Sequence, residues 1–453
     1  MKKIFVAISP FFKYFVIFSF FLVWNLIIQP INLDEIWNYG FIHNIYSGLI
    51  PYKDFNMVLT PLYPFIMSVF FFIFGSNIFV LHIVNALMIT GMLYLVAKLL
   101  NKDIGIFILL LCFPLSVAFP SYNLFLLLLF VVVVYLEKYK CNDYLIGFIL
   151  GLFILSKQTV GVCLCLPTIY YLFKDYKKVI KRIVGCFVPC IIFLIYLLCV
   201  GSLMNFLDLC LFGLFDFAEI NSRGFGIMLL ISVLLLGLNM YLIIKRKNNL
   251  FYYYLLSFFS ILLPLFDLYH LEIYVFVFVM VFLLESKKEF NFKFINTELF
   301  IYGILVGVVV FTFNSRFSEV IYFPNDINHF EYRAVNKKYL EYTESINSKY
   351  NYYKKLGYDV IFLSADGYYF RLNNDDKISY IDLINSGNWG YNGSSKLLNY
   401  VKTHDDAVFF LDESEIGTNK QTDQNVLKYV LKNGKVIDEV LIYDIYILGE
   451  SNG

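Results

Sequence analysis

The sequence predicts a polytopic α-helical membrane protein with about eleven spans and a C-terminal α/β domain. Of the 453 residues, 59% are hydrophobic and 16% are charged, and the mean hydropathy is +0.68, which excludes an ordinary soluble globular protein. The apolar residues form continuous runs, as spanning helices of about 20 residues require, whereas a membrane β-barrel would show alternating segments of about ten. These runs stop after Phe313, where the composition changes sharply.

The apolar runs divide residues 1–313 into candidate spans. The first run follows basic residues, as in a signal peptide, but it is long and lacks a small-residue cleavage pattern, so we expect an uncleaved span. The short stretch 62–75 is more typical of a shallow helix at the outer interface than of a full span. The expected spans are residues 11–31, 76–98, 104–120, 121–137, 144–158, 159–173, 183–201, 225–244, 249–267, 270–286 and 297–313.

Basic residues predict the orientation, because those in short loops remain on the cytoplasmic side. Lys2, Lys3 and Lys13 precede the first span, and every second loop after it is basic. The opposite loops carry few basic residues, notably Lys53, Lys157 and Arg223. We therefore expect a multi-pass protein of a cytoplasmic membrane, with residues 31–61 as its first outer loop. Abundant Phe, Tyr, Ile, Asn and Lys are typical of an AT-rich genome, which favours a bacterial membrane. The residues of the basic loops are Lys98, Lys102, Lys138, Lys140, Lys174, Lys177, Lys178, Lys181, Arg182, Lys245, Arg246, Lys247, Lys287, Lys288 and Lys293.

Residues 314–453 have the composition of a water-facing domain, with fifteen lysines and arginines against twenty aspartates and glutamates, a net charge of −5. An odd number of spans from a cytoplasmic start places this domain outside the membrane. Runs rich in branched and aromatic residues predict strands at 358–364, 378–384 and 407–411, and one or two more within 436–448. Helical patterns cover 335–356, 395–403 and 423–432, with Gly357 and Gly434 as stops. The alternation predicts a small α/β layer.

The C-terminal domain contains no glycine-rich phosphate loop and no nucleophile elbow, which favours a supporting or acceptor-handling role over independent catalysis. All eight cysteines lie before residue 211. Cys163 and Cys165 lie one residue apart in an apolar helix, which favours small buried hydrophobic residues over a metal site. The sequence therefore predicts no disulfides in the outer domain.

An acidic doublet, Asp34 and Glu35, directly follows the first apolar run. Ionisable groups at a membrane boundary are costly and usually functional. The sequence after the doublet stays polar and aromatic to Pro64, which predicts an active-site loop. Further candidates fall on the same expected side of the membrane, and such convergence is typical of a binding site. They are Lys53, Asp54, Asn123, Lys157, Gln158, Arg223, Asp267, Tyr269 and His270.

The outer face of a membrane favours one kind of chemistry. No nucleotide cofactors are supplied there, so a biosynthetic enzyme must receive its activated group on a carrier delivered through the bilayer, and a lipid-phosphate sugar meets that requirement. Its phosphate leaves without a general acid, while the acceptor hydroxyl needs a carboxylate base, a role that fits Asp34. A fixed cation such as Lys157 would stabilise the departing phosphate. The alternative for Lys157 is a side chain that snorkels to the interface.

A known family carries a similar ordered set of residues. The chain resembles the membrane glycosyltransferases of the GT-C type, in the branch of the bacterial relatives of the protein mannosyltransferases and the lipid A aminoarabinose transferases. The resemblance is strongest over residues 30–160. It rests on Asp34-Glu35, Gly40, Ile45, Gly48, Pro51-Tyr52-Lys53-Asp54-Phe55, Thr60-Pro61-Leu62-Tyr63, Phe74-Gly75 and Lys157-Gln158-Thr159.

The resemblance implies a multi-span helical fold, a polyprenyl-phosphate sugar donor, and direct transfer with inversion to a surface glycan, glycolipid or protein acceptor. It makes Asp34 the catalytic base and Glu35 a neighbour that orients the acceptor or helps to hold a cation. Many relatives have a second acidic residue at the outer start of the fourth span, where this chain has Asn123. A divalent cation therefore stays open, and we expect no nucleic-acid partner.

Several residues have two possible roles. His270 and Arg223 either contact the donor phosphate beside Lys157 and Gln158 or are hydrogen-bonded interface residues. Most aromatic residues belong to lipid-facing packing and interface belts. Tyr39, Tyr52 and Tyr63 are the exceptions, which we expect to offer surfaces on which a sugar stacks, near Lys53 and Asp54.

Two other functions compete with glycosyl transfer. A surface-polysaccharide polymerase also uses polyprenyl-linked sugars, but it usually places its key groups in large loops between later spans and has no terminal α/β domain. A lipid-linked oligosaccharide flippase would have charged groups near the bilayer midplane, whereas those here cluster at one surface.

Overall fold

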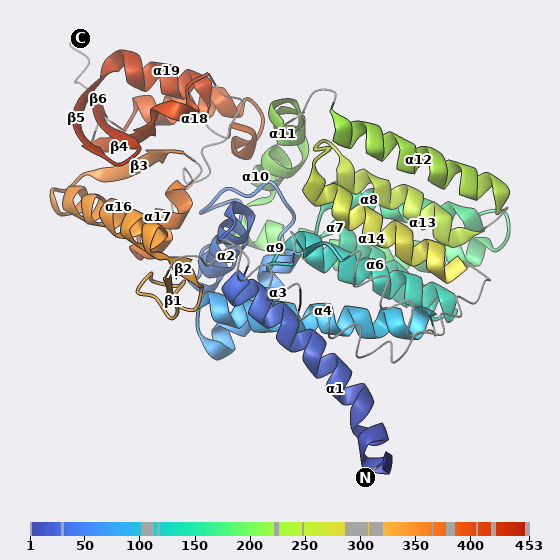
Figure 1. Cartoon of the computed structure of the whole chain (residues 1–453). Helices are drawn as coiled ribbons and strands as arrows, with labels where there is room; N and C mark the ends of the chain where they lie inside the picture. Colours follow the sequence, from blue (N-terminus) through green and yellow to red (C-terminus); the bar gives the residue numbers. More distant parts are fainter. Residues whose placement is uncertain are drawn as a thin grey trace.

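The computed structural model describes residues 2–28, 31–100, 113–115, 118–221, 226–246, 249–285, 307, 320–364, 366–376, 386–404, 406–417 and 423–448. The chain forms a helical part and a C-terminal domain that contains a four-stranded sheet (Figure 1). The helical part consists of α1 (Lys2–Val23), continued by the π-turn η1 (Trp24–Ile28), α2 (Leu33–Tyr46), α3 (Leu62–Phe74), α4 (Ile78–Leu100), α6 (Tyr122–Lys138), α7 (Asp143–Ile154), α8 (Gln158–Cys165), η3 (Leu166–Tyr171), α9 (Tyr176–Val200), α10 (Leu203–Leu207), η4 (Asp208–Phe212), α11 (Gly213–Asn221), α12 (Ile227–Lys245), α13 (Leu250–Phe258), η5 (Phe259–Leu262) and α14 (Leu268–Glu285).

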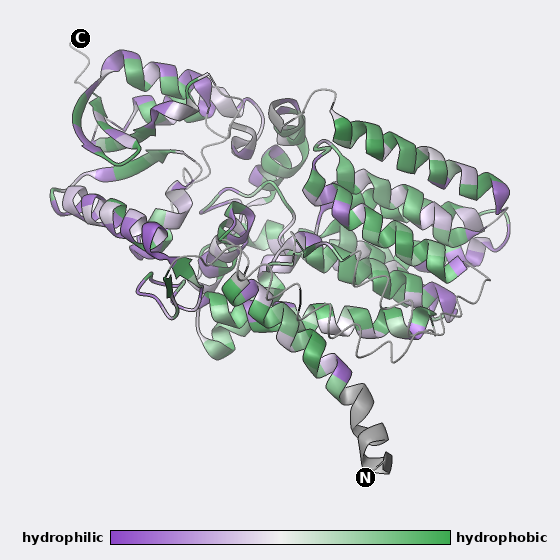
Figure 2. Ribbon diagram, in the orientation of Figure 1, coloured by the Kyte–Doolittle hydropathy of each residue, from purple (hydrophilic) through white to green (hydrophobic). Residues whose placement is uncertain are grey.

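Four of the described helices are long and apolar enough to cross a membrane: α4, α9, α12 and α14. The apolar windows of α4 and α14 are 50% buried within the fold, whereas those of α9 and α12 are 17% buried. The helical part is correspondingly apolar in Figure 2, while the C-terminal domain alternates hydrophilic and hydrophobic residues. Several apolar helices of this kind are the mark of a membrane protein.

The described residues do not confirm a count of about eleven spans. α3 is a short apolar helix, as expected for 62–75, but α7 has only 12 residues and α8 has 8 before it tightens into the 3₁₀-helix η3. Helices of this length fall short of the hydrocarbon thickness. Most of the predicted span 104–120 lies outside the described residues, and so does all of 297–313 except residue 307.

Three glycines let α7 and α9 approach each other closely. A β-carbon on Gly147 would lie 2.1 Å from the carbonyl oxygen of Arg182, and one on Gly151 would lie 2.5 Å from that of Cys186. From the other helix, a β-carbon on Gly185 would lie 2.2 Å from the carbonyl oxygen of Tyr144. Small residues four apart are a common way for helices in membranes to pack backbone against backbone.

The end of the helical part that carries the basic loops is fixed by a buried ion cluster. Arg182 on α9 contacts Glu137 at the end of α6, with 3.0 Å from Nη2 to Oε2, and its Nε donates to Asp143 at 2.9 Å. Tyr254 on α13 donates a further hydrogen bond to Glu137 at 2.7 Å. Because a buried charge needs a partner, this cluster ties four helices together.

Residues 320–448 form a second layered unit around a mixed sheet. A short antiparallel pair, β1 (Ile321–Tyr322) and β2 (Val335–Asn336), precedes it. The four strands stand in the order β3-β4-β6-β5, with β3 and β4 parallel and the other neighbours antiparallel. The elements are β3 (Asp359–Leu363), β4 (Ala407–Asp412), β5 (Gly434–Val440) and β6 (Tyr443–Leu448), with helices α16 (Lys337–Lys355), α17 (Gly367–Asn373), η6 (Ser386–Trp389), α18 (Gly393–Lys402), η7 (Glu413–Glu415) and α19 (Gln424–Asn433).

Alternate strand residues face two separate cores, as a strand with both faces covered requires. Phe362 and Phe410 join Tyr350 of α16 in the core that continues into the helical part. Ile361 and Phe409 belong to a second core with α18 and α19. The sequence prediction of a small α/β layer is confirmed, including both strands of the parallel pair and the three longer helices. The predicted strand 378–384 lies outside the described residues.

The glycine contact between α7 and α9 gives a stability prediction. We expect Gly147→Leu to force the helices apart and to reduce the free energy of unfolding by on the order of 3 kcal/mol, measured as a lower melting temperature in detergent. Gly237→Leu on α12 is the matched control, because a β-carbon there meets nothing within 4 Å. Equal melting temperatures for the two variants would contradict the close packing.

Candidate functional site

Asp34 lies in the first turn of α2, in the segment that the sequence suggested would be an active-site loop. Asn32 caps this helix, because its side-chain oxygen accepts a hydrogen bond from the Asp34 amide at 2.8 Å. Asn38 donates to the Asp34 carbonyl at 2.6 Å and accepts from the amide of Tyr122 at 3.3 Å. Residues 33–46 therefore form a helix and not the expected loop. The cap residue Asn32 and the side chain of Asn38 hold Asp34 beside the start of α6.

Lys157 lies in the break between α7 and α8, where it is the N-terminal cap residue of α8. The break is tight, since a β-carbon on Gly161 would lie 2.3 Å from the backbone nitrogen of Ile154. Lys157 is 9% exposed, and its ammonium lies 5.6 Å from the centre of the Tyr122 ring. The ring of Tyr122 attracts the ammonium of Lys157. This attraction is weaker than the hydration that the ammonium loses on burial.

Asp34, Lys157 and Asp267 interact electrostatically at this end of the helices. Burial and then the neighbouring Asp267 raise the pKa of Asp34 to about 6, against the opposing influence of Lys157. Among the residues that the structure describes, neither Asp34 nor Lys157 closes a direct ion pair. The site thus holds a carboxylate that titrates near neutrality next to a buried cation.

The start of α14 completes the site. Asp267 accepts hydrogen bonds from the backbone amide of His270 and pairs with its Nδ1, both at 2.9 Å. Tyr269 accepts from the side-chain amide of Asn123 on α6 at 3.1 Å. His270 and Asn123 therefore lie in the region of Asp34, as the sequence suggested. Asp267 was expected to converge with these residues but had no assigned role, and its electrostatic interaction with Asp34 suggests one.

Glu35 does not face this site. Its Oε2 lies 2.7 Å from Nη2 of Arg333 in the C-terminal domain, and its Oε1 lies 2.9 Å from Nε2 of His82 on α4. The three side chains are at most 1% exposed. Burial alone would raise the pKa of Glu35, but Arg333 and His82 hold it below its usual value. The expected contact of Glu35 with an acceptor or a cation is not supported, because both oxygens are engaged.

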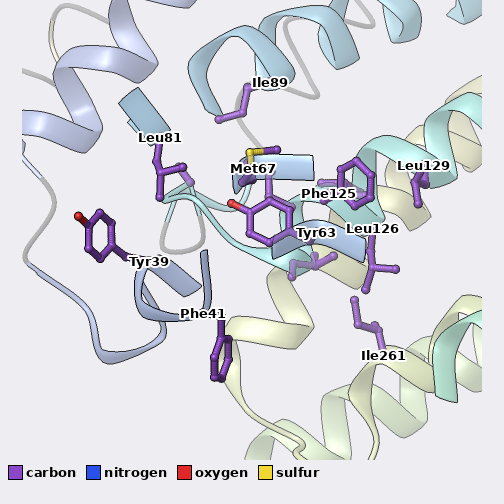
Figure 3. Close-up of a cluster of buried hydrophobic side chains, with 14 of the residues drawn as sticks. Tyr39, Phe41, Tyr63, Met67, Leu81, Ile89, Phe125, Leu126, Leu129 and Ile261 are labelled. Atoms are coloured by element: carbon purple, nitrogen blue, oxygen red, sulfur yellow. The ribbon is translucent and has the colours of Figure 1, made fainter. Parts of the chain in front are cut away.

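The three tyrosines expected to stack on a sugar are fully buried. Tyr39 bonds Ser76 at 2.9 Å, and Tyr52 donates to the carbonyl of Leu59 at 2.6 Å. Tyr63 lies in the apolar cluster of Figure 3, with its ring centre 5.9 Å from that of Phe125. Their rings pack the core of the helical part, so none offers a free face to a ligand.

Other residues of the predicted site shape the polypeptide around it. Asp54 accepts from the amide of Ile50 at 2.7 Å and so closes a turn, while Lys53 is exposed. Gln158 donates to the carbonyls of Val58 and Cys210 at 2.9 and 3.1 Å, which fixes the loop near Lys157. Arg223 lies outside the described residues.

The described residues contain no group of three histidine, cysteine or acidic side chains that could hold a metal ion. Asn123 has a buried side-chain oxygen that meets no hydrogen-bond partner in the described part of the chain. An amide oxygen alone is a weak substitute for a carboxylate ligand.

Comparison of the chain with family models, with curated proteins and with solved structures finds no match in any of the three.

The two adjacent acidic residues are expected to affect stability in opposite directions. The pKa of Asp34 is raised in the folded state, so its charged form costs stability above pH 6, and this cost disappears as the pH falls below its unfolded pKa of about 4. Asp34→Asn should therefore stabilise the protein at pH 8 by on the order of 1–2 kcal/mol. Glu35→Gln should destabilise it by about 3 kcal/mol, because Arg333 loses its buried partner.

The measurement is the melting temperature of both variants and the wild type at pH 8 and pH 5. The stabilisation by Asp34→Asn should shrink at the lower pH. A loss of stability in Asp34→Asn at pH 8, similar to that of Glu35→Gln, would contradict the two different environments.

Proposed function

We propose that the chain is a membrane glycosyltransferase that moves a sugar from a polyprenyl-phosphate donor to an acceptor hydroxyl. The observation that carries the proposal is the combination of Asp34, a carboxyl group with a pKa of about 6, and the buried Lys157. A base that titrates near the working pH suits proton abstraction from a hydroxyl. A buried lysine next to it suits an anion as its ligand.

The reaction follows from these two groups. The acceptor hydroxyl attacks the anomeric carbon, Asp34 takes its proton, and the bond from that carbon to the phosphate oxygen breaks. The electron pair leaves with the carrier phosphate, whose growing negative charge Lys157 stabilises more strongly in the transition state than in the ground state. A single displacement of this kind inverts the anomeric configuration.

The position of the basic residues supports a site on the outer side of the membrane. The C-terminal end of α4 lies among the basic loops. There the carbonyl of Lys98 accepts a hydrogen bond from the hydroxyl of Tyr139, at the end of α6, at 3.2 Å. The other end of α4 contacts the C-terminal domain, where the amide of Ile78 donates to His329 at 3.2 Å. A helix of 23 residues separates the two ends by about 34 Å. Basic residues favour the cytoplasmic side, so the C-terminal domain belongs outside.

The acceptor in this proposal is a surface glycan, a glycolipid or a protein. The C-terminal domain contacts α2 at Glu35, the residue after Asp34, and suits a supporting or acceptor-handling role. A flippase remains the alternative of another class, but the charged residues of this site lie at one end of the described helices rather than at their midpoint.

Purified protein in lipid, supplied with a polyprenyl-phosphate hexose and an acceptor extract, tests the reaction directly. We expect free carrier phosphate to be released by the wild type and not by Asp34→Asn, which retains donor binding. Lys157→Ala should raise the donor KM and lower kcat together, because the phosphate contact is lost in both states. Lys245→Ala is the matched control, as this exposed lysine lies at the C-terminal end of α12, in one of the basic loops. Wild-type protein that moves the lipid but releases no carrier phosphate would favour a flippase.

The pH dependence of kcat/KM gives a second test. The base must be ionised, so we expect the rate to rise with pH through about 6 and to level off above it. Asp267→Asn removes a like charge and should shift this midpoint to lower pH, whereas His270→Gln keeps that charge and should leave the midpoint near 6. An unchanged midpoint in Asp267→Asn would show that the group whose ionisation controls kcat/KM is not Asp34.

A further inference from the structure

We propose that Arg333 is a positioning residue for Asp34. Through its buried ion pair with Glu35, the C-terminal domain holds the first turn of α2 so that Asp34 points to the Lys157 site. This inference rests on the proposed function and deepens it, because it makes the C-terminal domain part of the catalytic unit.

The ion pair is built from three distant parts of the chain. Glu35 comes from α2, His82 from α4 and Arg333 from the segment before α16, 298 residues away from Glu35. A buried charge is stable only when it is compensated, and Oε2 of Glu35 pairs with Arg333 at 2.7 Å while Oε1 lies 2.9 Å from Nε2 of His82. Moving the carboxylate away from Arg333 would leave two buried charges uncompensated, so the first turn of α2 has one favoured position.

Arg333 is itself held rigidly. The side-chain amide of Asn325 donates to the Arg333 carbonyl at 2.6 Å and to that of Phe330 at 3.0 Å. The next residue, Ala334, donates its amide to the carbonyl of Leu26 at 2.8 Å. The guanidinium therefore starts from a backbone that is fixed to the end of the first helix as well as to its own loop.

The rest of α2 packs on the same domain. A β-carbon on Gly40 would lie 1.7 Å from the ring of Tyr368, and Asn44 donates to the hydroxyl of Tyr368 at 3.1 Å. The ring centre of Tyr39 lies 5.3 Å from that of Phe330. α2 is thus clamped along its length, with an ion pair at the turn that carries Asp34 and apolar contacts further on.

Adjacent residues of a helix point in different directions, about 100° apart around its axis. Glu35 can therefore face α4 and Arg333 while Asp34 faces Lys157 and Asp267. Any rotation of the first turn that displaces Glu35 moves Asp34 as well. A shift of about 1 Å in a reacting group can reduce a rate about 100-fold, even when the change lies away from the chemistry.

The test compares transfer kinetics and melting in Arg333→Met and in the double variant Glu35→Gln/Arg333→Met. We expect Arg333→Met to lower kcat about 100-fold with little change in donor KM. The double variant removes the uncompensated charge, so it should regain most of the melting temperature without regaining kcat. Recovery of kcat together with stability would reduce Arg333 to a structural role and overturn the proposal.

The control for a general effect of the domain contact is Lys396→Met. Lys396 pairs with Asp208 at 2.6 Å. This ion pair also joins the C-terminal domain to the helical part, but it does not involve α2. We expect kcat to stay near the wild-type value in this variant. A loss of kcat as large as in Arg333→Met would show that any weakened domain contact suffices, and would overturn a specific role for Arg333.

A second readout does not depend on activity. Asp34→Cys is alkylated with a water-soluble maleimide, alone and combined with Arg333→Met or Lys396→Met, and the rate at position 34 is followed by mass spectrometry. We expect a several-fold change in rate with Arg333→Met and none with Lys396→Met. An unchanged rate overturns the positioning role, whereas a changed rate in a protein that transfers no sugar supports it and overturns the proposed function alone.

Discussion

The buried carboxylate of Glu35 connects the three parts of this molecule that meet at the candidate site. It contacts Arg333 of the C-terminal domain at 2.7 Å and His82 of α4 at 2.9 Å, and it belongs to the helix that begins beside Asp34. Because the charges of Glu35 and Arg333 are buried, their pairing constrains how α2 and the C-terminal domain can sit together, and the contact with His82 adds α4. The C-terminal residues that looked like a separate water-facing domain are therefore continuous with the core of the helical part.

Two adjacent acidic residues have opposite environments, and this difference organises the site. Glu35 is ionised and held by the positive charge of Arg333. Asp34 has no direct ion-pair partner in the described part of the chain, and its pKa is raised to about 6. Such a separation of roles between two carboxylates is how a protein keeps one as a base and uses the other for structure. The nearby Lys157 is similarly costly for the fold, and its cost is consistent with an anionic ligand.

Local sequence patterns predicted much of the fold but only part of the site. The strands at 359–363 and 407–412 and the helices that start at Gly393 and Gln424 follow from residue patterns that repeat over a few positions. The convergence of Asp34, Asn123, Lys157 and His270 was also foreseen, because alternating loops share one side of a helical bundle. The pairing of Glu35 with Arg333 was not, since no local pattern links residues 298 positions apart. The burial of Tyr39, Tyr52 and Tyr63 was not foreseen either. Tyrosines in a polar segment are typical of a ligand-binding surface, but the rings of these three pack against residues of α3, α10 and α6 that are distant in the sequence.

The central claim is that a carrier phosphate binds at Lys157 with its sugar turned toward Asp34. An experimental structure of the protein in lipid, bound to a non-hydrolysable polyprenyl-phosphate sugar, measures this most directly. The account predicts a phosphate oxygen about 3 Å from Nζ of Lys157 and the anomeric carbon on the side of Asp34. A donor phosphate bound away from Lys157, with Asp34 facing no part of the sugar, would contradict it.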